Sequence, residues 1–299
     1  MYSETGHFTP TPPFDFSKSL DFLGLFAPMH GEQTIASQRL TKAVYIEGRV
    51  IGFQLITTGT NDAPQLQYTL FSEQPLSDDI QNAAIDHISF FLSLNDDLRP
   101  FYQIASDDTD FSPIVQELYG YHQVKFLTPF ENACWAVLTQ RNAMNMSQRM
   151  KHALIEAYGG SIDIQGIVYH AFPEAAQMAD ASEGELLSVV RNARKAEYLA
   201  AVVRAFNEVD EQFLRMGNYD EVERWLRSIR GFGEWSASFV LLRGLGRMER
   251  VPLSEKKLLE AASRQYGHGK DLTRTEVEKI AEGYKPYKGY WAHYLRVGA

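Results

Sequence analysis

Hydrophobic and polar residues alternate with a period of two between Lys42 and Phe71. The apolar runs are interrupted at Glu47-Gly48 and again over residues 59–64, both rich in turn-forming residues. This alternation is typical of half-buried strands, and Gly, Asn and Asp mark the turns that connect them. The pattern therefore predicts a small antiparallel sheet near the N-terminus.

After the sheet, apolar residues recur every three or four positions, as they do along one face of an α-helix. Residues 76–120 carry this spacing before a polar, acidic stretch, and from Thr128 onward the whole pattern is helical. The Thr-Pro-Phe-Glu sequence at 128–131 combines a capping residue, a proline at the first helical position and an early acid, so we expect a helix to start there. Another helix is expected to run from Ser182 to Val203.

These patterns predict an α+β protein in which a small antiparallel sheet unit precedes a larger all-α unit. We expect an N-terminal α/β domain over residues 1–120 and an all-α region over residues 121–299. The 299 residues include one cysteine, Cys134, which excludes a disulfide framework and Cys-rich metal sites and indicates a reducing compartment. Its place on an apolar helical run predicts a buried structural thiol.

The sequence contains neither a membrane span nor a metal motif. No run approaches 18 apolar residues, and residues 1–20 lack the basic and apolar regions of a secretory signal. None of the eight His forms an HxH or HxxxH pair, so we expect no transition metal and no cofactor. The expectation is an intracellular, cytoplasmic protein with no membrane partner.

The net charge of −9 is distributed unevenly. Residues 1–150 hold 8 basic and 17 acidic residues, whereas residues 151–299 hold 21 of each. Within the second half, residues 224–257 contain eight Lys or Arg against three Glu. An anionic partner is expected to dock there, although an ordinary solvated helix face would show the same pattern.

The same segment contains a helix, a glycine turn and a second helix. Apolar residues at helical spacing lead into Gly231-Phe232-Gly233, and the next helix begins near Glu234. Two glycines allow a sharp turn and leave backbone N–H groups uncovered at the start of the second helix. Such a turn can bind a DNA phosphate without reading the base sequence, but a lone GxG is more often only a turn.

The sequence around this turn resembles the helix-hairpin-helix (HhH-GPD) DNA glycosylase superfamily, and within it the AlkA-type 3-methyladenine DNA glycosylases II. LRSIRGFGEWSA at 226–237 is similar to the family hairpin LxxIxGIGxWTA, and LLRGLG at 241–246 continues the similarity. Further similar segments lie at 12–17, read as an opening strand, at 129–140, 194–196 and 284–287. The resemblance covers most of the chain.

The resemblance implies a monofunctional glycosylase that flips alkylated purines out of damaged duplex DNA and hydrolyses the N-glycosidic bond in base excision repair. The family's catalytic Asp falls on Glu255, preceded by Ser254 where the family usually has another acid. A carboxylate there can stabilise the positive charge that grows on the sugar. The alternative is a surface Glu255 that only pairs with Lys256 or Arg250.

Four aromatic positions match the family's base pocket, and for each the alternative is ordinary core packing. Trp235 also occupies the position where bifunctional relatives carry a Schiff-base Lys, so we expect no lyase activity. The matching aromatic residues are Trp235, Phe239, Phe22 and Tyr284.

The resemblance also implies a DNA-contacting set. Arg141, after Gln140, falls where the family inserts a side chain into the gap left by the flipped base, although apolar wedges are commoner. Gly231, Gly233 and Ser236 are expected to contact phosphate, and the hairpin carbonyls could hold a monovalent cation. We expect a monomer, associated with the nucleoid if prokaryotic.

Two other functions share this pattern. One is a lesion-binding protein that has lost catalysis, suggested by the Ser254-Glu255 departure from the family. The other is a glycosylase for oxidised or deaminated bases, with the same fold and a different pocket.

Overall fold

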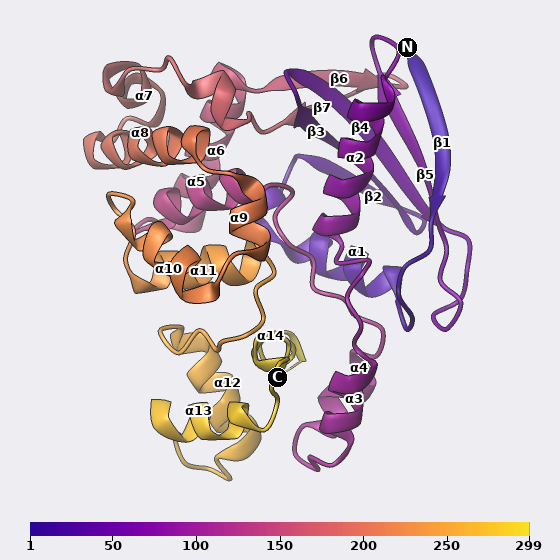
Figure 1. The fold of residues 1–299 in the computed structure, drawn as a ribbon, viewed down its shortest axis with the longest axis vertical. Coiled ribbons are helices and arrows are strands. Elements are labelled where there is room, and N and C mark those ends of the chain that lie inside the picture. The colour runs from indigo at the N-terminus through magenta and orange to yellow at the C-terminus, as the bar shows by residue number, and fades with distance from the viewer. Residues whose placement is uncertain (299) are drawn as a thin grey trace.

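The N-terminal part of the chain forms a five-stranded antiparallel sheet. The structure is a computed structural model that describes residues 1–298. Its strands, in the spatial order β1-β5-β4-β3-β2, are β1 (Tyr2–Phe8), β2 (Gln33–Ala36), β3 (Arg39–Ile46), β4 (Arg49–Thr57) and β5 (Leu66–Ser72). The alternation between Lys42 and Phe71 thus predicts β3 to β5 correctly. One face of the sheet is covered by α2 (Asp78–Phe91), as Figure 1 shows.

A second, two-stranded sheet contradicts the prediction that everything after Thr128 is helical. It consists of β6 (Gly160–Ile164) and β7 (Ile167–Ala171). Gln165 and Gly166 make the turn with φ angles of 56° and 86°, and Asp163 Oδ1 accepts a hydrogen bond of 2.8 Å from the Gly166 N–H. The apolar side of this hairpin packs on the first sheet through Ile162, Ile164, Tyr169 and Ala171, which meet Ala43 and Phe71.

The rest of the described chain is largely helical. The helices are α1 (Phe16–Leu25), α3 (Arg99–Ser106), α4 (Ser112–Glu117), α5 (Pro129–Thr139), α6 (Met144–Tyr158), α7 (Glu183–Val190), α8 (Ala193–Glu208), α9 (Glu211–Met216), α10 (Tyr219–Ser228), α11 (Glu234–Arg243), α12 (Lys256–Tyr266), α13 (Arg274–Glu282) and α14 (Lys288–Gly298). Two short 3₁₀ segments are η1 (Ala27–Met29) and η2 (Ala175–Met178).

Two local expectations are wrong because side chains cap helices. The segment at 12–17 is not an opening strand: the Asp15 carboxylate accepts a 3.0 Å hydrogen bond from the Ser17 N–H and starts α1. The single helix expected between Ser182 and Val203 is two, because Arg191 takes a left-handed φ of 52° and Asn192 caps α8.

The helix that starts at Thr128 is the centre of the second half. As predicted, the Thr128 hydroxyl accepts a hydrogen bond of 3.1 Å from the Glu131 N–H. Residues 129–138 are all buried, and α6, α8 and α11 pack around α5.

Glu131 is part of a buried ion cluster, in which Lys151 Nζ lies 2.6 Å from both Glu131 and Glu32, and Lys42 lies 3.1 Å from Glu32.

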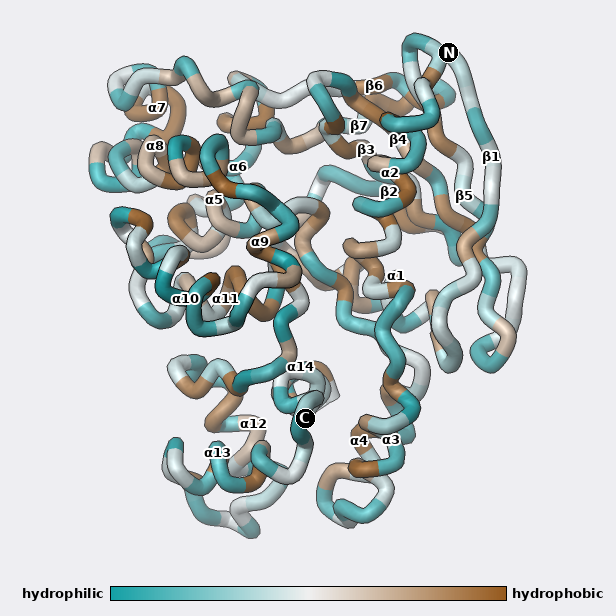
Figure 2. The backbone as a smooth tube through the Cα atoms, viewed as in Figure 1, coloured by the Kyte–Doolittle hydropathy of each residue, from teal (hydrophilic) through white to brown (hydrophobic). Residues whose placement is uncertain are grey.

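Two hydrophobic cores organise the chain. The first joins the sheet and α1–α4 to α12–α14, and the second is formed by α5–α11. In Figure 1 the sheet lies on one side and α5–α11 on the other, with α12–α14 below. Hydrophobic and hydrophilic stretches alternate along α8 and α11 (Figure 2), which matches their half-buried positions. Phe239 of α11 packs against both cores. The domain boundary expected at residue 120 stays a prediction.

Candidate active site and DNA-binding hairpin

The predicted helix, glycine turn and second helix are α10, residues 229–233 and α11. Gly231 has a φ of +93°, and a Cβ there would lie 2.3 Å from the Tyr198 ring. Both the backbone conformation and the close approach of Tyr198 therefore require glycine at this position. Gly233 caps α11 in an extended conformation, and a Cβ there would meet nothing within 4 Å. Its surroundings therefore leave space at the start of α11.

The segment after α5 is tied to this hairpin. The Gln140 side-chain amide donates to the Gly231 carbonyl at 2.9 Å and to the Ser236 hydroxyl at 3.3 Å. Ser236 is itself buried, and its hydroxyl is bonded to Gln140 within the protein. Only the backbone of Ser236 therefore remains for a phosphate contact at the start of α11. The Gly231 carbonyl, one candidate cation ligand, already accepts a hydrogen bond from Gln140. The hairpin cation stays a prediction.

Arg141 follows Gln140 in an exposed, left-handed turn with a φ of 54°. A hollow of about 400 Å³ adjoins it, lined by cationic and amide side chains without a carboxylate: Gln140, Arg141, Asn142, Asn192, Arg194 and Lys195, with Tyr198 and Gly231. The Lys195 ammonium donates to the carbonyls of Val137, Leu138 and Gln140 at 2.8, 2.9 and 3.0 Å. Lys195 therefore fixes the end of α5 from which Arg141 projects.

Glu255 lies at the start of α12, and its side chain is only 10% exposed. It does not cap its own helix; Oε2 lies 2.9 Å from Arg296 Nη1 of α14. The surface pairings considered from the sequence do not form, because Arg250 pairs with Asp220 and Glu223, and Lys256 with Glu260. Glu255 is thus a nearly buried carboxylate held by one guanidinium.

Three of the four expected pocket residues belong to one aromatic cluster, which we define as Trp235, Phe239, Phe126, Phe26 and Phe22. Trp235 and Phe239 stack with centroids 5.1 Å apart and planes at 9°. Contacts of 5.9, 5.3 and 5.0 Å then connect Phe239 to Phe126, Phe126 to Phe26 and Phe26 to Phe22. Phe126 is buried, and the other four rings are partly buried.

Tyr284 lies in different surroundings. Its ring packs against Phe111 and Trp291 at 5.3 and 5.7 Å, and its hydroxyl donates to Asp108 at 2.5 Å. Burial and the neighbouring Asp108 raise the pKa of the Tyr284 hydroxyl far above its usual value. The structure therefore places Tyr284 in the core between α4 and α14, outside the aromatic cluster.

Comparisons with known proteins agree with this geometry. A family model described as "HhH-GPD superfamily base excision DNA repair protein" matches residues 134–286, about half of the chain and all of the hairpin. The chain belongs to this superfamily.

Relatives and structures extend the likeness beyond the matched segment. This HhH-GPD protein is 26% identical over 263 residues to a Bacillus subtilis DNA-3-methyladenine glycosylase, covering 87% of this chain and 86% of the relative. Its fold matches an Archaeoglobus fulgidus 3-methyladenine DNA glycosylase with a TM-score of 0.80 at 18% identity, covering 98% and 97% of the two chains. A Clostridium acetobutylicum 8-oxoguanine glycosylase/lyase gives a TM-score of 0.71 at 15% identity, covering 100% and 98%.

Three buried side chains with polar groups, Arg243, His293 and Tyr121, adjoin the aromatic cluster of the HhH-GPD protein. The Arg243 guanidinium lies 4.9 Å from the centre of the Phe22 ring and 3.4 Å from His293 Nδ1, and His293 Nε2 lies 3.2 Å from the Tyr121 hydroxyl. Burial, together with Arg243 and Arg296, holds the pKa of His293 well below its usual value. The imidazole is therefore neutral, with Nδ1 accepting from Arg243 and Nε2 donating to Tyr121.

Burial also lowers the pKa of Arg243 to about 10, while Glu255 opposes that shift and Arg296 adds to it. The guanidinium thus stays charged at neutral pH, within electrostatic reach of both groups. Sequence reasoning missed Arg243, His293 and Arg296 as parts of this site. Only Arg243 carried a signal, since it lies four residues after Phe239 and so on the same helical face.

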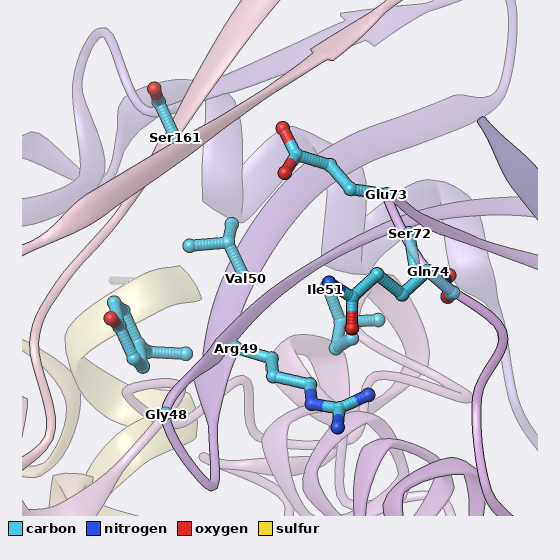
Figure 3. A pocket seen from close by; sticks show the side chains of 9 residues that line it. Gly48, Arg49, Val50, Ile51, Ser72, Glu73, Gln74 and Ser161 are labelled. Carbon is cyan, nitrogen blue, oxygen red and sulfur yellow. Dashed lines mark hydrogen bonds between the residues drawn. The ribbon is translucent and has the colours of Figure 1, made fainter.

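One further hollow lies beside the first sheet, apart from this site. A pocket of about 380 Å³ beside the sheet is lined by Arg49, Glu73, Gln74, Ser161 and neighbouring residues (Figure 3), and it contains none of the predicted site residues. Within residues 1–298 no helix is long and apolar enough to cross a membrane. The same residues include no group of three His, Cys, Asp or Glu arranged to hold a metal.

Proposed function

We propose that this HhH-GPD protein is a monofunctional DNA glycosylase that excises alkylated purines of the 3-methyladenine type. Glu255 would be the catalytic carboxylate, the aromatic cluster would stack on the flipped base, and the hairpin would bind a phosphate. The observation that carries the proposal is the nearly buried Glu255 carboxylate, which pairs with Arg296. Glu255 also interacts electrostatically with Arg243, whose guanidinium packs on the ring of Phe22. The name of the Bacillus subtilis relative supports the substrate class.

The chemistry of the residues fits this reaction. As the N-glycosidic bond breaks, positive charge develops on the sugar, and a carboxylate with little access to water stabilises that charge strongly. A base made cationic by alkylation leaves easily and stacks well on electron-rich rings. The proposal therefore requires no general acid.

The test is release of methylated purines from methylated duplex DNA. Glu255→Gln keeps the size of the side chain and removes its charge, so excision should fall at least 100-fold while binding to DNA with an abasic-site analogue persists. Glu260→Gln is a matched control, because Glu260 lies one turn further along α12, is exposed and pairs with the exposed Lys256. Undiminished release by Glu255→Gln would exclude the proposed role.

The same assay separates the alternatives. A lesion-binding protein without catalysis would bind the abasic analogue and release no base from any substrate. A glycosylase for oxidised or deaminated bases would release those bases in preference to methylated purines when the substrates compete. Because Trp235 occupies the Schiff-base position, we expect the abasic product strand to stay intact and borohydride to trap no covalent adduct.

A further inference from the structure

The hollow beside Arg141 carries positive charge without a balancing carboxylate. It lies where the end of α5, the start of α8 and the hairpin meet, and its lining includes Arg141, Arg194 and Lys195 but no Asp or Glu. The nearest acidic residue along α8, Glu197, forms an ion pair with Arg230 at the hairpin. Three cationic side chains therefore line one space, and together they attract an anion.

The three cations differ in what they can offer to an anion. The Lys195 ammonium already donates to three backbone carbonyls, so it contributes charge and no free hydrogen. Burial lowers the pKa of Lys195 to about 8, which leaves the ammonium protonated at neutral pH. Arg141 and Arg194 are exposed, and within residues 1–298 neither guanidinium has a hydrogen-bond acceptor or a carboxylate partner. Both are thus free to donate to a ligand in the hollow.

The amide groups of the lining are already used within the protein. The Gln140 amide donates to the Gly231 carbonyl at 2.9 Å, and the Asn142 amide donates to the Leu138 carbonyl at 3.1 Å. The free donors are therefore the two guanidiniums, and a guanidinium matches the oxygens of a phosphate in a fork of parallel hydrogen bonds. The hollow of about 400 Å³ has the volume of about 13 water molecules, which is ample for a phosphodiester group.

We propose that this hollow binds a DNA phosphate other than the one at the hairpin, with Arg194 as its main ligand. The hollow shares Gly231 with the hairpin and Arg141 with the segment predicted to fill the gap left by the flipped base, so DNA that reaches both passes over it. Such a contact adds affinity and fixes the position of the duplex without reading its sequence. This inference rests on the proposed function, because it requires DNA to lie across the hairpin.

The experiment measures how salt affects binding of Arg194→Gln to a duplex with an abasic-site analogue. Loss of one phosphate contact should reduce the slope of log Kd against log salt by about 0.9 and weaken binding about fivefold at about 0.15 M salt, since the counterion effect vanishes near 1 M. Arg204→Gln is the control, because Arg204 is also exposed but lies about 15 Å further along α8, outside the hollow. Its slope should equal that of wild type. An equal slope for Arg194→Gln overturns the inference.

Single methylphosphonates, each of which removes the charge of one phosphate, locate the contact on the DNA. At one position, on either strand, the substitution should weaken binding by wild type about fivefold and leave Arg194→Gln unaffected. At the hairpin phosphate it should weaken both proteins equally. If no position distinguishes the two proteins, or if the effect of Arg194→Gln follows the base opposite the abasic site instead, the inference is overturned.

These measurements do not depend on base excision. A wild-type protein that shows the Arg194 contact and releases no methylated purine would refute the proposed function and support the inference. A wild-type protein that excises these bases, with a slope that Arg194→Gln leaves unchanged, would support the proposed function and overturn the inference.

Discussion

Replacing Gly231 by Ala tests whether the hairpin geometry has been understood. At a φ of +93° an Ala residue takes a left-handed conformation, which costs about 1–2 kcal/mol. Its Cβ would lie 2.3 Å from Tyr198 Cγ, so the ring or the hairpin must move, at a further cost of about 1–3 kcal/mol. The free energy of unfolding should therefore fall by about 2–5 kcal/mol, and the melting temperature by about 4–20 °C.

Gly233→Ala is the matched control. An added Cβ there meets nothing within 4 Å, and the extended φ of −111° suits any L-residue, so the stability should fall only by about 1 kcal/mol, the difference between Gly and Ala at an N-cap. If DNA phosphate approaches this open side, Gly233→Ala should nevertheless weaken binding to an abasic-site duplex. Thermal unfolding and binding titrations on both variants decide the matter. A Gly231→Ala protein that melts within 1 °C of wild type would refute the reasoning.

Other predictions concern the buried ion cluster and the segment after α5. Lys151→Met leaves Glu131 and Glu32 without their shared cation 2.6 Å away, and urea unfolding should show a loss of about 3–5 kcal/mol. Burial raises the pKa of the Glu32 carboxyl, but the ammonium groups of Lys151 and Lys42 lower it further, so the net shift is downward. The ionised Glu32 therefore stabilises the fold above the pKa of the unfolded state, and this stabilisation is lost as the pH falls through the pKa of the folded state. Melting temperatures should therefore fall more steeply below pH 4 in wild type than in Glu32→Gln. Arg141→Ala should weaken binding to an abasic-site duplex much more than to intact duplex, whereas equal losses would make Arg141 a phosphate contact only.

The parts of the fold that the sequence predicted are those fixed by local interactions. The strands between Lys42 and Phe71 follow from alternation, and the start of α5 follows from the Thr128 cap. The hairpin at Gly231 was predicted because two glycines between two helical apolar patterns allow a sharp turn. In each case a few neighbouring residues contain the whole physical reason.

The missed features depend on partners distant in sequence. The β6–β7 hairpin is short, and it is stabilised by packing on Ala43 and Phe71, which no local pattern reveals. Tyr284 is an aromatic residue of the kind expected in a base pocket, but its contacts with Asp108 and Trp291 hold it in the core. Arg296 could not be connected with Glu255, because only the packing of α14 brings the two together.

The first core has a consequence for synthesis of the chain. Its residues come from the sheet and α1–α4 at one end of the sequence and from α12–α14 at the other. During translation α4 and Phe101 of α3 must wait, with the side that faces α14 uncovered, until those last helices leave the ribosome. Glu255 acquires Arg296 only at the same late moment. A nascent chain therefore holds its hairpin long before its carboxylate is in place, and the order of synthesis itself delays any chemistry until folding is complete.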